Sequence, residues 1–418
     1  MGVSPLSDPP CLPKKNDPFF RPFTMTDQVE LPAPSPGNRI SSLDLLKGLV
    51  MVIMALDHTR DYFYSSFSML NVTDPEHTTP ALFFTRWITH FCAPTFSLLA
   101  GVSAWIMGRR MTKAELSMFL IKRGLWLILL EMTVICFAWY FDVQYRNNDL
   151  AVIWSLGISM IFLALFIHLP AALNLFLSLV IIAGHNLLDN VHFEGNLLWS
   201  MLHEPASFPV GANMTLHVFY PAVPWIGVMS LGYWLGRCYG KDVPATHRKK
   251  LFNGIGVSLL VGFLAIRWTN FYGEPANWRT FPEWWRTLFS FFHLSKYPPS
   301  FLYLAATLTG TFFFLANSEK WKGRIVDFFS VFGRVPFFYY VLHLYLIHGL
   351  AMLAAELSGF GWEIMVQTGM EVDLQGFGVG LGAVYLIWAS VILLLYPLCR
   401  WFDRHKRAHK ERWWLSYL

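Results

Sequence analysis

The stretch VIMALDHTRDYFY, from Val52 to Tyr64, starts as an apolar run and then places four ionisable side chains within five positions. In a helix, Asp57, Arg60 and Asp61 share one face, because residues three and four positions apart are neighbours. His58 lies roughly 100° around the helix from Asp57. Arg60 can neutralise one of the two carboxylates, so the other carboxylate needs a partner elsewhere in the protein.

The composition around this stretch is that of an integral membrane protein. Of the 418 residues, 55% are hydrophobic and only 14% are charged, whereas about a quarter of the residues in soluble domains are charged. Aromatic residues make up 17%, which fits the enrichment of Trp and Tyr at membrane–water interfaces. The lipid bilayer is therefore the first expected partner, and no nucleic-acid partner is expected.

About ten apolar runs are long enough, or nearly so, to cross a bilayer, which takes about 20 residues. They lie near Leu43–Tyr64, Phe83–Met107, Met118–Tyr140, Leu150–Leu169, Ala171–Leu188, Val218–Leu235, Leu251–Ile266, Phe301–Ala316, Gly333–Leu353 and Val379–Leu398. The predicted fold is an all-α polytopic membrane protein with about ten transmembrane helices.

Basic clusters predict the orientation of these helices. They follow the second, sixth, eighth and tenth runs, at Arg109–Lys113, Arg237–Lys250, Lys320–Arg324 and Arg400–Arg407. Loops rich in Lys and Arg face the cytoplasm, so these connections and both termini are predicted to be cytoplasmic.

Three segments follow from this arrangement. Residues 1–38 are Pro-rich and polar and are predicted to be a disordered cytosolic tail, in which Met25 is a second possible start. Residues 39–400 form the transmembrane domain. Residues 401–418 mix basic and aromatic side chains, which is typical of a segment at the inner membrane surface.

The ionisable cluster of the opening stretch is predicted to lie at membrane depth. Asp57 is about 20 Å along the helix from Asp44 at 1.5 Å per residue, which is inside the far leaflet. Charged groups at this depth usually mark a functional site. The alternative is a helix end whose charges pair with one another.

Other polar groups lie in apolar runs and have structural alternatives. Arg86 and His90 share a helix face, His343 is near mid-membrane, and Glu131 needs a partner or a proton. Histidine suits general base catalysis because its reference pKa is near 6.5, but a buried histidine is often only a hydrogen-bonded core residue.

Cationic groups near the predicted cytoplasmic face form a candidate site for an anionic ligand such as a phosphate. The cationic candidates are Arg39, Lys47, Arg109 and Arg110, and the acidic Asp44 is included with them. The alternative is ordinary positive-inside charge. The five cysteines have no spacing typical of a metal site or a disulfide framework, and no metal is expected.

Several sequence blocks resemble the DUF1624 membrane proteins, which are related to the catalytic domain of heparan-alpha-glucosaminide N-acetyltransferase. The blocks are RISSLDLLKGLVMVIMALDHTRDYF, TTPALFFTRWITHFCAPTFSLLAG, KRGLWLILLE, FYPAVPWIGVMSLGYWLG, KYPPSFLYLAATL and GRVPFFYYVLHLYLIH. The resemblance implies a transmembrane acyltransferase that takes acetyl from cytosolic acetyl-CoA, its co-substrate, and delivers it to a sugar or amino sugar on the far side. In a bacterium this membrane would be the inner membrane.

The resemblance also implies roles for single residues. Arg39, Asp44 and Lys47 match the pattern that opens the family's first helix, and His343 matches a histidine in its late helix. The family's lysosomal enzyme has its catalytic histidine in the first outer loop, where the candidates here are His77 and His58.

Acyl transfer needs a base for the acceptor and a donor for the oxyanion. Asp57 with His58, or His343, is predicted to supply the base, and Arg60 or Arg86 the oxyanion donor. A proton-coupled small-molecule transporter is the alternative function, a non-catalytic scaffold is a third, and a homodimer is possible in each case.

Overall fold

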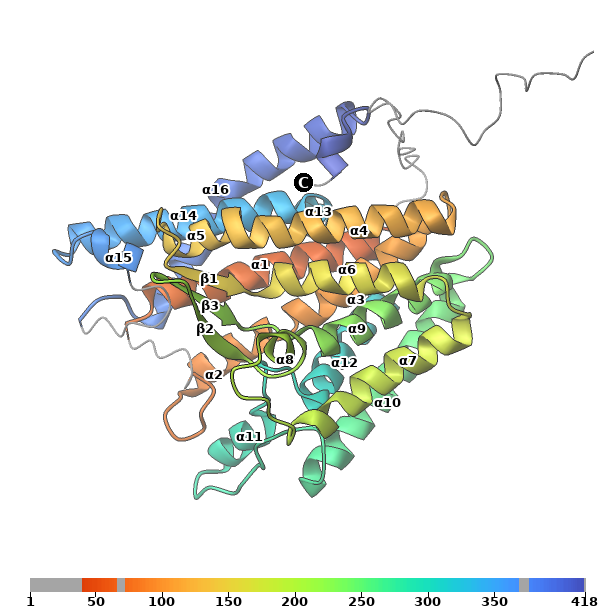
Figure 1. Ribbon diagram of the computed structural model, residues 1–418, viewed down its shortest axis with the longest axis horizontal. Coiled ribbons are helices and arrows are strands. Elements are labelled where there is room, and N and C mark those ends of the chain that lie inside the picture. The colour runs from red at the N-terminus through yellow and green to blue at the C-terminus, as the bar shows by residue number, and fades with distance from the viewer. Residues whose placement is uncertain (1–39, 66–71, 368–375, 417–418) are drawn as a thin grey trace, which may run out of the picture.

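The computed structural model describes residues 40–65, 72–367 and 376–416, and it is mostly helical (Figure 1). The helices that build the central body are α1 Ser41–Phe63, α2 Pro80–Thr89, α3 Cys92–Gly108, α4 Lys113–Leu130, α6 Val152–Phe166, α9 Ala222–Leu235, α12 Phe301–Ser318, α13 Arg324–Arg334, α14 Pro336–Leu357 and α16 Leu381–Ala408. In Figure 1, α1, α4, α6 and α14 run roughly parallel to one another.

The remaining elements are peripheral or short. The helices are α5 Cys136–Tyr140, α7 Ala171–Gly184, α8 Leu197–Leu202, α10 Ala245–Thr269, α11 Trp284–Phe292 and α15 Glu363–Gln367. A π-helical turn spans Glu131–Ile135, and 3₁₀ turns span His185–Leu188, Gly236–Tyr239 and Trp413–Ser416. The strands are β1 Asn147–Leu150, β2 Ala206–Val210 and β3 Met214–Val218.

Six helical stretches within the described residues are long and apolar enough to cross a membrane. They are Pro80–Gly108, Ala171–Leu188, Ala245–Thr269, Phe301–Ser318, Pro336–Leu357 and Leu381–Ala408. α1 has 23 residues, but it carries five Asp, Arg or Lys side chains, so length and composition alone do not identify it as a span. The prediction of many membrane helices is confirmed, and six of about ten spans are recognisable by these criteria.

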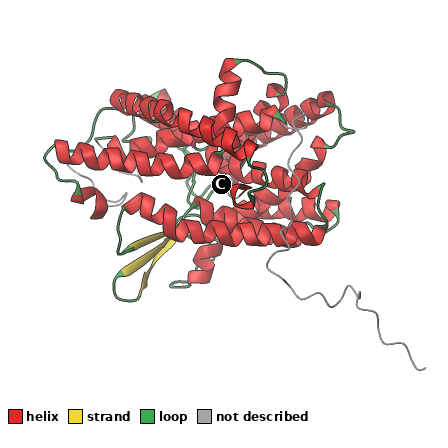
Figure 2. Cartoon of the chain, turned by 90° about the horizontal axis from the view of Figure 1, so that it is seen from above, coloured by secondary structure: helices red, strands yellow, loops and turns green. Residues whose placement is uncertain are grey.

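A small sheet departs from the predicted all-α fold. The strand order is β1-β3-β2, with β1 parallel and β2 antiparallel to β3. Figure 2 shows these strands at one edge of the helical body. The all-α prediction was wrong at this point, because β1 and β3 lie about 70 residues apart in the sequence and periodicity does not reveal such pairing. The parallel pairing places Asp149 of β1 opposite His217, just before α6 begins.

α1 lies at the centre of the fold and contacts α2, α3, α12, α13, α14 and α16. Its crossing with α13 is so close that the backbones touch. A Cβ atom on Gly48 would lie 1.7 Å from the carbonyl oxygen of Phe329, and one on Gly333 would lie 1.8 Å from that of Asp44. Only glycine fits at these two positions, so the crossing fixes the position of α1.

The connection between α10 and α12, residues 270–300, is a folded cap segment that includes α11. The buried Arg267 guanidinium at the end of α10 donates hydrogen bonds to the carbonyl oxygens of Ala276, Ser290, Phe291 and His293. The Glu274 carboxyl accepts hydrogen bonds from the Ser295 N–H at 3.0 Å and the Ser300 hydroxyl at 2.6 Å. These contacts fix the short stretch 295–300 that leads into α12.

Candidate active site

A cavity of about 570 Å³ follows α1 from Lys47 to Asp61. Asp61 lies fourteen residues after Lys47, which corresponds to about 21 Å of helix, so the cavity is elongated. Its charged and histidine lining residues are Lys47, Asp57, His58, Asp61, Arg86, Arg123, Asp149 and Lys296. Lys47 and the stretch from Asp57 to Asp61 lie at opposite ends of the part of α1 that lines the cavity, and Arg86 and Lys296 both pair with Asp57.

Between Lys47 and Asp57, α1 lines the cavity with Met51 and Met54, and most of the remaining lining is also apolar. The apolar lining residues include Met51, Met54, Phe96, Ala100, Ala104, Met107, Phe119, Leu120, Leu127, Leu156 and Met160. A flexible, weakly polar molecule with charged groups at one end suits such a passage, since methionine side chains adapt to irregular shapes.

The two predicted histidines meet at the Asp61 end. His58 Nδ1 lies 2.9 Å from His343 Nε2, and His343 Nδ1 lies 3.0 Å from the carbonyl oxygen of Tyr339. A carbonyl only accepts, so in the neutral pair His343 carries its proton on Nδ1 and accepts at Nε2 from the His58 Nδ1–H. The His58 Nε2 atom therefore holds a lone pair.

Only one of these two rings lines the cavity. His58 is half-buried and faces it, whereas His343 is 0% exposed. Its ring stacks on His58 with centroids 5.0 Å apart. His58 is thus placed to act as a base, and His343 is placed to hold it.

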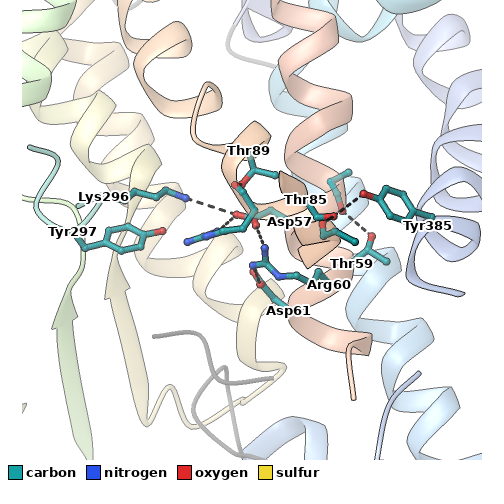
Figure 3. A network of polar contacts seen from close by, with 12 residues as sticks. Asp57, Thr59, Arg60, Asp61, Thr85, Thr89, Lys296, Tyr297 and Tyr385 are labelled. Carbon is teal, nitrogen blue, oxygen red and sulfur yellow. Dashed lines mark hydrogen bonds and ion pairs between the residues drawn. The ribbon is translucent and has the colours of Figure 1, made fainter. Parts of the chain in front are cut away.

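Asp57 does not hold His58 and instead joins a buried ion cluster (Figure 3). Its carboxylate pairs with Arg60 at 2.8 Å, with Arg86 in a shorter contact, and with Lys296 at 3.7 Å. Arg60 also pairs with Asp61 at 2.5 Å. The prediction that one carboxylate needs a partner elsewhere is confirmed, because Asp57 pairs with Arg86 and Lys296. Arg60 also contacts both carboxylates, since both lie on its helix face within reach of its guanidinium group.

The cap segment supplies two residues that sequence reasoning missed as site residues. Lys296 and Tyr297 line the cavity, and the Tyr297 hydroxyl lies 3.5 Å from that of Tyr220. The Tyr297 side chain is 40% exposed at the cavity. Desolvation raises the pKa of its phenol, but the charges of Lys296 and Arg86 outweigh this and lower the pKa below its usual value. The only sequence signal was the KYPPS motif in an outer connection.

The Lys47 end contains part of the predicted anion site. Lys47 donates a hydrogen bond of 2.8 Å to the Ser103 hydroxyl and lines the cavity, and Arg123 also belongs to the lining. Asp44, Arg109 and Arg110 do not line it. Arg109 instead lies over the Trp105 ring, 5.5 Å from its centroid. Arg39 lies outside the described residues.

Three other predicted site residues lie away from the cavity. His77 is on an exposed loop, with 69% of its side chain accessible, and pairs with Asp74 at 2.7 Å. His90 is buried against the Tyr303 ring. Arg60 is only 1% exposed and sits behind Asp57. The structure therefore brings His58, Asp57 and His343 together but leaves out His77 and His90.

Glu131 has a structural partner at the start of α6. Its carboxyl accepts a hydrogen bond of 2.9 Å from the Trp154 N–H in the first turn of that helix, and it belongs to the π-helical turn. Helix N-termini favour negative charge because their N–H groups are unpaired. This hydrogen bond provides the partner that the sequence predicted for Glu131. It also connects the end of α4 to the start of α6.

One group of side chains in the described part of the chain has metal-ligand spacing. Ligand atoms of Asp74, Glu76 and His77 lie within 4.8 Å of one another. The group is mostly exposed, Glu76 pairs with Arg279, and His77 pairs with Asp74. These contacts use part of the possible ligand atoms, and none of the three residues lines the cavity.

A known protein family matches more than half of this sequence. A family model described as "Heparan-alpha-glucosaminide N-acetyltransferase, catalytic" matches residues 39–263, more than half of the chain. None of the curated proteins matches the sequence. The matched region contains His58, Asp57, Lys47 and Arg123, whereas Lys296, Tyr297 and His343 lie beyond it.

Proposed function

The chain belongs to the heparan-alpha-glucosaminide N-acetyltransferase catalytic family, and from this premise we propose that it transfers an acetyl group from acetyl-CoA to a sugar or amino sugar across a membrane. It is an integral membrane protein, with several apolar helices of spanning length. The observation that carries the proposal is that one cavity is lined both by the cations Lys47 and Arg123 and by His58.

Acetyl-CoA fits the polarity of this cavity along its length. Lys47 and Arg123 would bind the phosphates, since ammonium and guanidinium groups both bind phosphate oxygens. The flexible pantetheine arm would follow the apolar, methionine-rich middle. Its thioester would then lie beside His58. On the positive-inside rule the Lys47 end faces the cytoplasm, where acetyl-CoA is made.

The chemistry is a direct transfer in which His58 moves one proton. His58 Nε2 takes a proton from the acceptor hydroxyl or amine as the acceptor attacks the thioester carbon. The carbon–sulfur bond then breaks, and the leaving thiolate takes the proton from His58. The products are the acetylated sugar and CoA, with no net change in protons. His343 Nε2 accepts the His58 Nδ1–H throughout and stabilises the imidazolium form.

The family match gives no support to the proton-coupled transporter considered as an alternative. The acceptor is proposed only as a sugar or amino sugar. A bacterium has no heparan sulfate, so in a bacterial membrane an envelope sugar would be the acceptor.

The first prediction concerns His58. The purified protein in detergent is expected to gain thermal stability from micromolar acetyl-CoA, because a ligand that binds only the folded state stabilises it. It is also expected to release CoA when glucosamine is added. His58→Ala should keep the stabilisation and lose about 10²- to 10⁴-fold in the rate of CoA release, the usual contribution of a general acid–base group.

Two results would contradict the proposal. If acetyl-CoA neither stabilises the wild type nor releases CoA with glucosamine or hydroxylamine, the protein is not an acetyl-CoA-dependent transferase. If His58→Ala turns over at the wild-type rate, the base lies elsewhere. Lys249→Ala provides a matched control, because Lys249 is exposed and distant from the cavity lining.

A further inference from the structure

We propose that Lys296 and Tyr297 of the cap segment form the oxyanion site, with the Lys296 ammonium and the Tyr297 hydroxyl donating to the thioester carbonyl oxygen as it gains negative charge. This assignment rests on the proposed acyl transfer. The cap segment would then take part in catalysis, in addition to closing one side of the cavity.

The first argument is position. Lys296 and Tyr297 line the same end of the cavity as His58. Lys296 also pairs at 3.7 Å with Asp57, the residue before His58 in the chain. In Figure 3 both cap-segment side chains point towards Asp57, the neighbour of His58 in the sequence. A thioester carbonyl placed beside the base therefore has these two donors as neighbours.

The second argument is that carboxylates hold the two arginines in closer contacts than they hold Lys296. Arg86 is in direct contact with the Asp57 carboxylate, and Arg60 joins Asp57 to Asp61 without lining the cavity. Lys296 is 3.7 Å from Asp57 Oδ2, which is beyond hydrogen-bond range. This ion pair keeps the ammonium in place but leaves its N–H groups able to donate to another acceptor.

The third argument is preorganisation. Oxyanion donors are effective when they are held in place before the charge develops. The Lys296–Tyr297 pair lies between Ser295 and Ser300, which both donate to the Glu274 carboxyl. The Ser295 hydroxyl also donates to the Pro298 carbonyl oxygen at 3.1 Å. The two donors thus sit on a loop that is fixed at both ends, and Glu274 is a positioning residue.

The step balances without a further reactant. As the acceptor adds to the thioester carbon, the carbonyl π electrons move to oxygen, and Lys296 and Tyr297 donate hydrogen bonds to that oxygen. As the C=O bond re-forms, the carbon–sulfur bond breaks and sulfur takes the proton held by His58. Neither Lys296 nor Tyr297 changes its own protonation.

The test compares Lys296→Met and Tyr297→Phe with two matched controls in the same segment. Tyr272→Phe removes a hydroxyl that donates to the Ala183 carbonyl oxygen, and Arg279→Met removes a cation that pairs with Glu76 on the surface. CoA release from acetyl-CoA is measured with glucosamine and with hydroxylamine. Acetyl-CoA binding is measured separately as thermal stabilisation.

Loss of one oxyanion donor is expected to lower kcat by about 10²- to 10³-fold. The KM for acetyl-CoA and the stabilisation by acetyl-CoA should stay near wild type, and both controls should stay within about twofold. Lys296→Arg keeps the positive charge and should recover at least tenfold of the activity lost in Lys296→Met. This arginine variant also serves as the test if the methionine variant does not fold.

Three results separate this inference from the proposed function. Wild-type kcat in both Lys296→Met and Tyr297→Phe, with an active wild type, overturns the oxyanion assignment alone. Loss of the stabilisation by acetyl-CoA in these variants also overturns the oxyanion assignment, because Lys296 and Tyr297 would then bind acetyl-CoA in its ground state. A wild type without any CoA release overturns the proposed function itself.

Discussion

At the scale of the residue, the main feature is a histidine held by a second histidine. In many acyl-transfer sites a carboxylate orients the base, and Asp57 is next to His58 in the sequence. Here Asp57 pairs with three cations, and His343 takes the orienting position at 2.9 Å. A neutral acceptor costs less to bury than a carboxylate, which suits a site between apolar helices.

The second prediction follows from this pair. His343→Leu removes the acceptor for the His58 Nδ1–H and is expected to lower kcat/KM on the order of 10²-fold, within the range of acid–base effects. His343→Gln offers a side-chain oxygen at a similar reach and should recover part of the loss. CoA release measured from pH 5 to 9 checks this, and equal rates in wild type and His343→Leu would show that the hydrogen bond has no catalytic role.

The sequence indicated part of this site and missed the rest for a physical reason. His58, Asp57 and His343 were recognisable, because polar groups in apolar runs need partners. Their pairing was not, since it depends on the packing of helices about 285 positions apart. Lys296 was harder still, because a lysine in an outer connection has the same sequence signature whether it faces water or a cavity.

At the scale of the element, the crossing of α1 and α13 decides where the site lies. The third prediction is that Gly48→Ala fails to fold or loses at least about 3 kcal/mol of stability, beyond the usual cost of overpacking. The added Cβ would lie 1.7 Å from a backbone carbonyl oxygen, which cannot move aside as a side chain can. Thermal unfolding in detergent measures the effect.

Gly254→Ala is the matched control for this substitution. Gly254 lies in α10 and a Cβ there would meet no atom within 4 Å, so alanine should be neutral or slightly stabilising, as its helix propensity predicts. Equal unfolding temperatures for Gly48→Ala and Gly254→Ala would contradict the close crossing.

The cap segment gives the fourth prediction, on pH. Burial raises the pKa of Glu274 from 4.5 to about 7, although hydrogen bonds from Ser300 and Ser295 act in the opposite direction. Between pH 4.5 and about pH 7, Glu274 therefore binds more protons in the folded protein than in the unfolded chain. Stability therefore falls as pH rises from 4.5 to 7 and is constant above, with a total change on the order of 3 kcal/mol.

Glu274→Gln isolates this contribution, because glutamine keeps an acceptor oxygen and does not titrate. The unfolding temperature of the variant minus that of the wild type should increase from pH 5 to 7 and then level off. A difference that does not change with pH would mean that Glu274 is ionised throughout this range.

The elements themselves were partly predictable. The apolar runs identified the helical regions, since a backbone in a bilayer must satisfy its hydrogen bonds locally. The π-helical turn at Glu131 and the separation of α13 from α14 were not predicted. The first depends on a contact with α6, and the second follows from Pro336, which disfavours helical conformation in the residue before it.

At the scale of the whole molecule, the cavity links two chemically different ends through an apolar middle. The fifth prediction is that Ala100→Phe, which adds a ring to the wall of this middle part, abolishes the stabilisation by acetyl-CoA while the protein still folds. The physical reason is that the ring occupies empty space and does not replace a packed side chain. Thermal stabilisation is again the measurement.

Ala265→Phe is the control for this change, since Ala265 lies on the exposed face of α10. It should leave the response to acetyl-CoA unchanged. A full response in Ala100→Phe would show that the donor does not pass through the middle of the cavity.

One helix, α1, carries both Lys47 at one end of the cavity and His58 towards the other. His58 lies eleven residues after Lys47, which corresponds to about 16 Å and about three turns of helix. An inserted residue would move His58 by about 1.5 Å and rotate it by 100°, away from both the cavity and His343, whereas an exchange of one side chain for another would leave the spacing intact. The site therefore requires a fixed number of residues between Lys47 and His58. Insertions or deletions in this part of α1 are incompatible with the site.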